Sequence, residues 1–553
     1  MLFLSAFIIL GTLLLLQGAS ASIDPAAFQS TPSGLAAPEE QTPSVLAGLF
    51  DLFEEEPDGW IAVTDGIDFQ SFQTPDPNNV FVARMELSDL DVILDSMIGQ
   101  GRLSGGTQTV SSMAASYEQV LNAWGGTAWG PRNDVVVAIN DDFYDSSGVP
   151  IRGQVYSGWY ARRHPDFENG SGFVWKNNRI PFIGGCINHP AVDQVITYAS
   201  GGTEKFQGIN IPRGSDELIL YTPQYDSSTQ TDDSGVEVLV ELTRPLLILP
   251  LPAMIDGTVR QIDDLQGDSF IPFDHIVLSA TGSLRTELLE SLQVGDPIGI
   301  SQELNHFQDD CVTNNPDDWT KAYASIGGSY HFIRGGAIQT FSDPGATTRH
   351  PRTAVAFDDD YIYFIVVDGR DPGVSEGMSI AELAQFTLTT LNASEAIAQD
   401  GGGSSTMVVD GQVVNTPSDT VPASCVLVFL PMVVSDSTAE GSSVTSNRPI
   451  SNSQNPCLQN AERPVANGLM MVVLDPKLQS SLYEAGEPIQ AVANLSLYLG
   501  PGNNYDVLGS VNQGANGVIL THSLAGINAT GSYWWKVDFG GLIGWVQEGL
   551  IGE

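Results

Sequence analysis

The chain has 553 residues, with 66 acidic and 22 basic side chains and a formal net charge of −44. Only 16% of the residues are charged, so acidic groups dominate a rather neutral surface. Because nucleic-acid binding depends on cationic side chains that neutralise phosphates, this balance argues against a nucleic-acid partner. The length allows roughly two to four domains.

The N-terminus predicts export. Residues 1–21 contain an apolar run that ends in small residues, Ala19-Ser20-Ala21, as at a signal-peptide cleavage site, although no Lys or Arg precedes the run. An uncleaved anchor is the alternative. Residues 22–57 are rich in Pro, Ala, Ser and Glu and predict a disordered linker. No later stretch is long and apolar enough to span a bilayer, so we expect a secreted or envelope-associated protein with no transmembrane span beyond the signal segment.

Four cysteines, Cys186, Cys311, Cys425 and Cys457, occur without CxxC spacing. An even number of cysteines in an exported protein favours two disulfides. We take Cys425 with Cys457 as the first hypothesis, because this pair brackets a polar stretch that a disulfide would tether.

The first half of the chain is rich in predicted strands. VFVARMEL at 80–87 predicts a strand, and the spacing of apolar residues at 109–124 predicts a helix. A buried strand at 133–145 ends in a polar turn. Residues 150–320 alternate short strands with loops rich in Gly, Pro and Asp, which is typical of a strand-rich mixed domain.

The second half begins with a predicted hairpin at 353–371 and an amphipathic helix at 378–394. The loop from Asp400 to Thr406 follows. A polar insertion at 435–460 then precedes a buried strand at 464–475.

The last unit, residues 476–553, has short strands, Gly-Pro and Asn-Asn turns and clustered aromatic residues, which predict a small all-β barrel. Trp534, Trp535 and Trp545 would form either its core or a binding groove. The predicted fold class is therefore α+β: a strand-rich mixed α/β domain at 58–475, which includes the polar insertion, followed by this barrel.

The loop Asp400-Gly401-Gly402-Gly403-Ser404-Ser405 is the most informative local feature. Three glycines allow close approach of a ligand to the backbone and positive φ angles. Successive N–H groups in such a turn can bind an anion, and the two serine hydroxyls lie beside them. No Lys follows, so this is not a Walker loop. A flexible turn between two elements is the alternative interpretation.

Five motifs in order resemble the phosphodiester glycosidase family over about residues 60–475. They are AINDDFYD (138–145), HPRTAVAF (350–357), VVDGRDPGVSEGMSIAELAQF (366–386), QDGGGSSTMVVDGQVVNTPSD (399–419) and ERPVANGLMMVV (462–473). Asp141 stands where the family often has Gly. The segment GPG-x-x-Y-x-V-L-G and the final GWV strand resemble a bacterial SH3-like domain, so we expect a bacterial source.

The resemblance implies a secreted hydrolase that cleaves the glycosidic bond of a sugar-1-phosphodiester, of the N-acetylglucosamine-1-phosphodiester kind, in glycoconjugates or envelope polymers. Its substrate would be a carbohydrate phosphate, and the SH3-like unit would take a cell-wall or glycan ligand. A non-catalytic envelope- or glycan-binding protein and a glycosidase for an uncharged exopolysaccharide are the alternatives. No cofactor is expected, since no GxGxxG motif follows a strand and no HExxH motif occurs. A divalent-metal requirement is left open.

Two arginines are candidates for the phosphate grip, because a guanidinium binds phosphate oxygens in a bidentate manner. Arg352 and Arg370 stand at predicted strand ends in a chain with few basic residues. Structural ion pairs with nearby acids are the alternative for both.

Three aspartates are candidates for catalysis, since glycoside hydrolysis uses carboxylates beside the anomeric carbon. We expect Asp400 to be the base or nucleophile, with Asp368 and Asp142 as further candidates. Asp368 is alternatively a turn-forming residue, and Asp142 alternatively orients Asn140, whose amide would hold a sugar hydroxyl. His350 is a weaker candidate for proton transfer. Gly401, Gly402, Gly403, Ser404 and Ser405 would contact phosphate or sugar oxygens.

Overall fold

The computed structural model describes residues 59–117, 131–163, 172–176, 178–184, 187–188, 194–243, 254–301, 305–306, 322–422, 458–476 and 479–552. All of them belong to one of the chain's two compact units, Leu52–Glu553. The predicted signal peptide and linker, all four cysteines and most of the polar insertion lie outside the described residues.

Strands dominate the described residues, and the predicted α+β class is wrong. The α-helices in these ranges are short, and the longest, α5 (Ile380–Thr390), has 11 residues. The strands form several large sheets, and strands such as β2 (Ile67–Thr74) bury alternate side chains, as the two-residue period of a strand requires. The helix expected at 109–124 is described as α2 (Val110–Tyr117). The protein is mostly β, with few helices.

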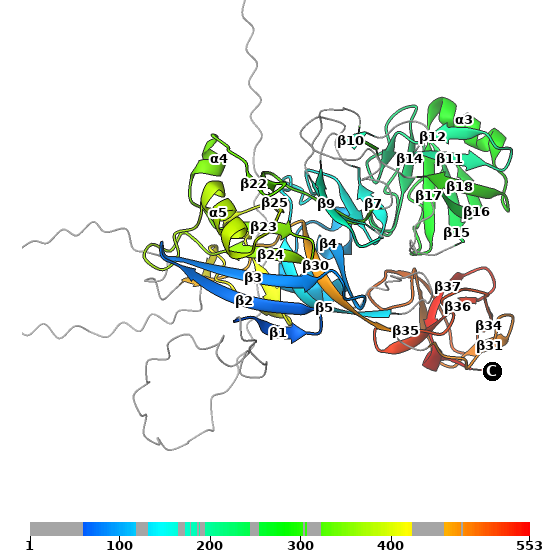
Figure 1. Ribbon diagram of the computed structural model, residues 1–553. Helices are drawn as coiled ribbons and strands as arrows, with labels where there is room; N and C mark the ends of the chain where they lie inside the picture. Colours follow the sequence, from blue (N-terminus) through cyan, green and yellow to red (C-terminus); the bar gives the residue numbers. More distant parts are fainter. Residues whose placement is uncertain are drawn as a thin grey trace, which may run out of the picture. The chain divides into compact units, whose positions relative to one another are not determined.

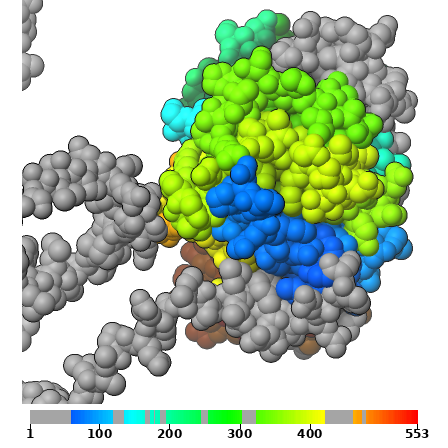
Figure 2. All heavy atoms as spheres, turned by 60° about the vertical axis from the view of Figure 1, so that its left-hand side comes forward, coloured from blue at the N-terminus to red at the C-terminus, as the bar shows by residue number. Residues whose placement is uncertain are grey.

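The first sheet has eight strands around the predicted hairpin at 353–371, which is confirmed (Figure 1). Its order is β1 (Ile61–Thr64), β2, β3 (Asn78–Glu86), β24 (Tyr361–Val367), β23 (Arg352–Phe357), β25 (Glu395–Ala398), β21 (His331–Arg334) and β22 (Ala337–Ile338). β3 pairs with β24, and the space-filling view shows blue residues from the N-terminal part of the described chain beside yellow-green residues from much later in the sequence (Figure 2).

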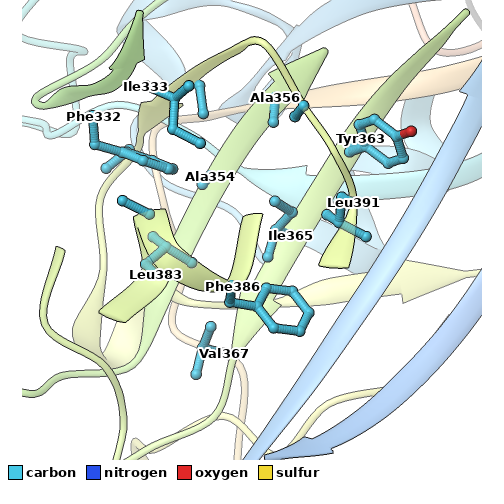
Figure 3. Packing of buried hydrophobic residues seen from close by; sticks show 14 of the residues in the cluster. Phe332, Ile333, Ala354, Ala356, Tyr363, Ile365, Val367, Leu383, Phe386 and Leu391 are labelled. Carbon is cyan, nitrogen blue, oxygen red and sulfur yellow. The ribbon is translucent and has the colours of Figure 1, made fainter. Parts of the chain in front are cut away.

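The predicted helix at 378–394 is confirmed as α5, which covers one face of this sheet. A capping box begins it: the Ser379 hydroxyl accepts from the Glu382 N–H, and the Glu382 carboxylate accepts from the Ser379 N–H. Leu383 and Phe386 point from α5 into a cluster of apolar side chains that includes Ile365 (Figure 3). Helix α4 (Pro344–Thr347) precedes β23.

The second sheet brings together strands that are far apart in the sequence. Its order is β27 (Gln412–Val413), β26 (Met407–Val409), β5 (Pro131–Asn140), β30 (Asn467–Pro476) and β4 (Val92–Ile98). Two 3-10 turns, η1 (Gly99–Gly101) and η2 (Leu103–Gly105), follow β4. The motifs at 138–145, 399–419 and 462–473 meet in this sheet, so it positions the candidate site.

The segment between β5 and β21 forms further sheets. A five-stranded sheet has the order β7 (Trp159–Arg162), β6 (Gln154–Tyr156), β20 (Ala322–Gly327), β8 (Gly172–Lys176) and β9 (Pro181–Gly184). An eight-stranded sheet, called the inserted sheet below, has the order β12 (Thr203–Lys205), β11 (Val195–Tyr198), β18 (Pro297–Ser301), β16 (Met254–Asp264), β15 (Val236–Leu242), β17 (His275–Ala280), β14 (Leu218–Tyr221) and β13 (Gly208–Ile209), with α3 (Gly282–Ser291) after β17. Two short pairs join β10 (Ile187–Asn188) with β19 (Asn305–His306) and β28 (Thr420–Pro422) with β29 (Leu458–Asn460).

The C-terminal unit is an all-β sheet, but its described pairings do not define the predicted SH3-like barrel. The order is β33 (Val507–Val511), β32 (Leu495–Tyr498), β37 (Ile543–Gln547), β36 (Ser532–Asp538), β34 (Asn516–Ile519), β31 (Pro488–Ala491) and β38 (Ile551–Gly552), with β35 (Ile527–Ala529) paired to β36 and the turn η5 (Glu548–Leu550) after β37. Trp534, Trp535 and Trp545 are at most 2% exposed. These tryptophans are core residues.

No helix within the described ranges is both long and apolar enough to span a membrane.

Candidate active site

The triglycine loop connects the first sheet to the second, between β25 and β26, and contains the 3-10 turn η3 (Gly402–Ser404). Asn140, at the end of β5, holds this loop: its Nδ2 donates to the Asp400 carbonyl at 2.7 Å. Its Oδ1 accepts from the Thr353 hydroxyl at 2.7 Å and from the Thr406 N–H at 3.1 Å. The side chain is completely buried. All of these contacts are internal, so the Asn140 amide positions Asp400 and is not free for a sugar hydroxyl.

The first two glycines allow close approach of their neighbours. A Cβ on Gly401 would lie 2.7 Å from the Pro351 carbonyl oxygen. Gly402 has a φ of +69°, a backbone angle that residues other than glycine rarely adopt. A Cβ there would lie 2.7 Å from Nη2 of Arg370, so this guanidinium lies directly against the loop.

The third glycine contacts a second guanidinium. A Cβ on Gly403 would overlap Nη2 of Arg463 and the carboxylate of Asp419. These two side chains form a bidentate ion pair, with Nε to Oδ2 at 2.7 Å and Nη2 to Oδ1 at 3.0 Å. Tyr144 lies beside them and donates its hydroxyl hydrogen to the Pro464 carbonyl at 3.1 Å. The triglycine sequence therefore brings two arginines to one loop.

Asp400 has the electrostatics of a residue that titrates near neutrality. Its Oδ2 accepts a hydrogen bond from the Ser404 hydroxyl at 2.6 Å. Burial raises the pKa of Asp400 to about 6, against the lowering effects of the Ser404 hydrogen bond and the Arg463 charge. The carboxylate is mainly ionised at pH 7 and can accept a proton or attack an electrophilic carbon.

Asp368 lies in a small cavity of about 70 Å³, which Arg370 and Ser418 also line. Its carboxylate accepts hydrogen bonds from Asn415 Nδ2 at 3.0 Å and from the Thr416 N–H at 3.0 and 3.1 Å. Burial raises the pKa of Asp368 to about 6. The Asp368 carboxylate therefore fixes the chain that follows β27. Arg370, which lines the same cavity, makes one side-chain hydrogen bond, from its Nη1 to Ser418 Oγ at 3.3 Å. Among the described residues, no carboxylate forms an ion pair with Arg370.

Asp142 is buried and ion-paired. Its carboxylate accepts from Arg152 Nη1 and from the Arg152 and Phe143 N–H groups, each at 2.8 Å. Burial raises its pKa in spite of Arg152. The neighbouring Asp141 is also buried; its Oδ2 has no hydrogen-bond partner within the described residues, and burial raises its pKa far above the usual range. The Asp141 carbonyl accepts the Asp400 N–H at 2.8 Å, so this turn supports Asp400 from behind.

Arg352 points away from the loop into the protein. Its Nε donates to the Met378 carbonyl at 2.7 Å, and its Nη2 donates to the carbonyls of Gly345 and Thr348 at 2.8 and 2.7 Å. The residue is only 8% exposed. These bonds hold the chain around α4 and leave the guanidinium little freedom to bind phosphate.

Ser405 and His350 are less well placed than Ser404. The Ser405 hydroxyl is buried, with no partner in the described part of the chain. His350 is half-buried, and burial, followed by the charges of Arg352 and Arg370, lowers its pKa. Because its pKa is lowered, the His350 imidazole is neutral at pH 7.

Sequence reasoning missed Arg463, Asp419 and Tyr144. Arg463 belongs to the ERPVAN motif, so its position in a recognised motif of an acid-rich chain was an available signal. Its pairing with Asp419 across 44 positions has no local sequence signature.

Residues 278–430 match the family model described as "Phosphodiester glycosidase". The matched range contains Asp368, Arg370 and Asp400 and excludes Asn140 and Arg463. This match indicates an enzyme of the glycosidase type that acts on a carbohydrate-derived substrate. No curated protein matches the chain.

Three solved structures show distant likeness. A hypothetical protein from Synechocystis is 17% identical, with a TM-score of 0.44; the alignment covers 74% of this chain but only 62% of that protein. A protein named as exported, from Burkholderia pseudomallei, is 19% identical, with a TM-score of 0.43 and coverage of 72% and 74%. The catalytic domain of zebrafish N-acetylglucosamine-1-phosphodiester α-N-acetylglucosaminidase, auto-inhibited by its pro-peptide, is 12% identical, with a TM-score of 0.33 and coverage of 74% and 82%.

Proposed function

We propose that this protein is an exported hydrolase of the glycosidic bond in a sugar-1-phosphodiester, of the N-acetylglucosamine-1-phosphodiester kind, within glycoconjugates or envelope polymers. One observation carries the proposal: Asp400, whose pKa is about 6, lies on a loop that the guanidinium groups of Arg370 and Arg463 contact. An uncharged glycoside would have no need of the guanidinium groups.

Arg370 and Arg463 form the proposed phosphate grip, in place of Arg352. In this overwhelmingly acidic protein, a phosphodiester anion requires local positive charge to enter. Nη2 of Arg370 lies against Gly402 and makes no hydrogen bond to a described residue, and Nη1 of Arg463 is not used in the pair with Asp419. Guanidinium groups bind phosphate oxygens through two N–H donors at once, which fixes the leaving group in place.

The proposed reaction breaks the bond between the anomeric carbon and the phosphate oxygen. The oxygen of water attacks the anomeric carbon, and Asp400 accepts the proton of that water. The electron pair of the broken bond moves to the phosphate oxygen, and the product is a phosphomonoester. Arg370 and Arg463 stabilise the charge that develops on this oxygen. Since a phosphate is a good leaving group, Asp400 alone supplies the proton chemistry.

A substrate comparison tests this proposal. Purified protein would be incubated at pH 7 with methyl N-acetylglucosamine-1-phosphate and, separately, with methyl N-acetylglucosaminide, and free sugar would be measured. We expect turnover of the phosphodiester by the wild type and its loss in Asp400→Asn. Arg370→Ala and Arg463→Ala should reduce cleavage of the phosphodiester by about 100-fold each, as expected for loss of a group that stabilises developing charge.

Arg285→Ala is the matched control, since Arg285 forms an exposed ion pair with Asp264 on the inserted sheet. Its activity should equal that of the wild type. Faster cleavage of the uncharged glycoside than of the phosphodiester would contradict the proposal and favour a glycosidase for neutral polysaccharides.

A further inference from the structure

A second cavity, of about 260 Å³, lies apart from the triglycine loop. Its walls come from β4 and α2, from the loop after β14 on the inserted sheet, and from the turn between β32 and β33 in the C-terminal unit. Small-molecule sites commonly have volumes of roughly 300–1,000 Å³. This cavity is slightly smaller than that range, so it suits a small ligand of one or two rings.

Two pairs of aromatic rings form much of the wall. Tyr117 and Tyr156 meet edge to face, with ring centroids 6.0 Å apart. Phe273 and Tyr505 have centroids 5.8 Å apart. All four line the cavity. Aromatic walls with a few well-placed polar groups are typical of specific small-molecule sites.

One buried polar atom of the wall lacks a hydrogen-bond partner, and two tyrosine hydroxyls on the same wall make no side-chain hydrogen bond within the described residues. The Oε1 atom of Gln224, a residue that is 4% exposed, has no hydrogen-bond partner in the described part of the chain. The hydroxyls of Tyr156 and Tyr505 make no side-chain hydrogen bond to any described residue, and the Tyr505 hydroxyl is close enough to contribute to raising the Tyr156 pKa. For the buried Gln224 Oε1 atom, the missing hydrogen bond costs about 1–3 kcal/mol. A ligand with hydroxyl or amide groups would pair with these three.

The charges of the wall are already paired. Arg102 donates from Nη1 to Asp226 at 2.9 Å and to Asp506 at 2.8 Å. One positive and two negative groups give the wall a charge of −1, which opposes an anion. Both carboxylates already contact Arg102, so neither is left unpaired to hold a cation. The chemistry of the wall fits an uncharged polar ligand.

The inserted sheet and the C-terminal unit are joined firmly beside the cavity. The Phe273 ring belongs to the buried cluster of Trp534 and Trp545. The backbone N–H of Phe273 donates to the Leu499 carbonyl at 3.1 Å. Next to it, the Lys536 ammonium donates to Asp274 at 2.6 Å. These contacts give the cavity a fixed wall.

Helix α2 connects the cavity to the candidate active site. At its start, the Ser111 N–H donates to the Glu462 carboxylate at 3.0 Å, next to Arg463 in the sequence. Tyr117, at its end, lines the cavity. The helix rises about 9 Å from Ser111 to Tyr117, so α2 links the backbone beside Arg463 to the wall of the cavity over a short distance.

We propose that this cavity binds an uncharged sugar residue of the glycan whose sugar-1-phosphodiester bond Asp400 cleaves. This inference rests on the proposed function for the identity of the substrate, but the binding itself requires no turnover. Tyr156, Tyr505 and Gln224 would hold the sugar hydroxyl or acetamido groups, and the rings would contact its apolar faces.

Binding by the full-length Asp400→Asn protein tests the inference. Isothermal titration calorimetry would compare an uncharged trimer of N-acetylglucosamine, N-acetylglucosamine-1-phosphate and tetramethylammonium chloride. We expect the trimer to bind, and Tyr156→Phe or Tyr505→Phe, added to Asp400→Asn, to weaken this binding by about 5- to 10-fold each, as expected for one hydrogen bond. Tyr198→Phe is the matched control, because the Tyr198 hydroxyl is buried on the inserted sheet outside the cavity. It should leave trimer binding unchanged.

Failure of the trimer to bind, or equal binding by all three tyrosine variants, would overturn the inference. Binding of tetramethylammonium that Tyr156→Phe or Tyr505→Phe abolishes would overturn it in favour of a cation site. The proposed function fails separately: loss of sugar release from methyl N-acetylglucosamine-1-phosphate contradicts that function whether or not the trimer binds. Conversely, normal sugar release without trimer binding contradicts the cavity assignment alone.

Discussion

Ser404→Ala should shift the pH dependence of catalysis, because the Ser404 hydroxyl donates a hydrogen bond to the Asp400 carboxylate at 2.6 Å. That bond lowers the Asp400 pKa, which burial raises to about 6. Hydrogen bonds to charged groups contribute about 1.5–3 kcal/mol. Since one pKa unit corresponds to about 1.4 kcal/mol, removing the hydroxyl should raise the Asp400 pKa by about one to two units.

The assay is kcat/KM for a sugar-1-phosphodiester between pH 4 and pH 9. An acid with a pKa of about 6 must lose its proton to act as a base, so the wild-type rate should fall as the pH drops through 6. In Ser404→Ala the same fall should occur about one to two pH units higher. The rate at pH 9 should be much less affected.

Ser405→Ala is the matched control, because the neighbouring Ser405 hydroxyl has no partner within the described residues. Its pH profile should overlay that of the wild type. An unshifted profile in Ser404→Ala, or equal shifts in both variants, would refute the assignment of Asp400 as the titrating group.

Two further substitutions test the framework of the candidate active site, and a third tests the contact between the inserted sheet and the C-terminal unit. Asn140→Ala removes three internal hydrogen bonds and should lower the free energy of unfolding by about 2–4 kcal/mol, measured by chemical denaturation; a change below about 0.5 kcal/mol would contradict the positioning role. Gly403→Ala should abolish sugar release and leave the circular dichroism spectrum unchanged, because the added Cβ would overlap the Arg463 guanidinium. Gly549→Ala is its control, since a Cβ on Gly549 meets nothing within 4 Å. An active Gly403→Ala variant would contradict the close contact between the loop and this guanidinium. Lys536→Met leaves the buried Asp274 carboxylate without its cation and should cost about 3–5 kcal/mol of unfolding free energy. A change below about 0.5 kcal/mol would contradict this role of Lys536 and mean that His275 and His522, which contact Asp274 at 2.6 and 3.1 Å, hold the carboxylate without it.

Local sequence patterns predicted the elements that position the site. Two apolar runs on either side of an acidic turn at 353–371 predicted the β23–β24 hairpin, and the helical spacing of apolar residues at 378–394 predicted α5. The hairpin and the helix each depend on residues that are close together in the sequence, so the local sequence is sufficient to predict them. The predicted α+β class was wrong because it gave too much weight to a few short helices, whereas the long-range strand pairing that builds the sheets leaves only a weak local signal.

The roles of individual side chains depended on contacts that no local pattern contains. Arg352 and Arg370 looked equivalent in the sequence, but only Arg370 lies against the triglycine loop. Arg352 is buried among backbone carbonyls of the α4 region. Asn140 was expected to contact substrate and instead makes internal hydrogen bonds to the loop. Arg463 reaches the site through strand pairing of β30, which the sequence could not orient.

The position of bond cleavage tests the central claim most directly. The wild-type enzyme would hydrolyse methyl N-acetylglucosamine-1-phosphate in oxygen-18-labelled water, and phosphorus NMR would show whether the phosphomonoester product carries the label. Attack at the anomeric carbon leaves every original oxygen on phosphorus, so we predict an unlabelled phosphomonoester together with free sugar. A labelled phosphate product would mean cleavage of the phosphorus–oxygen bond and would contradict the assignment of a glycosidase built around Asp400.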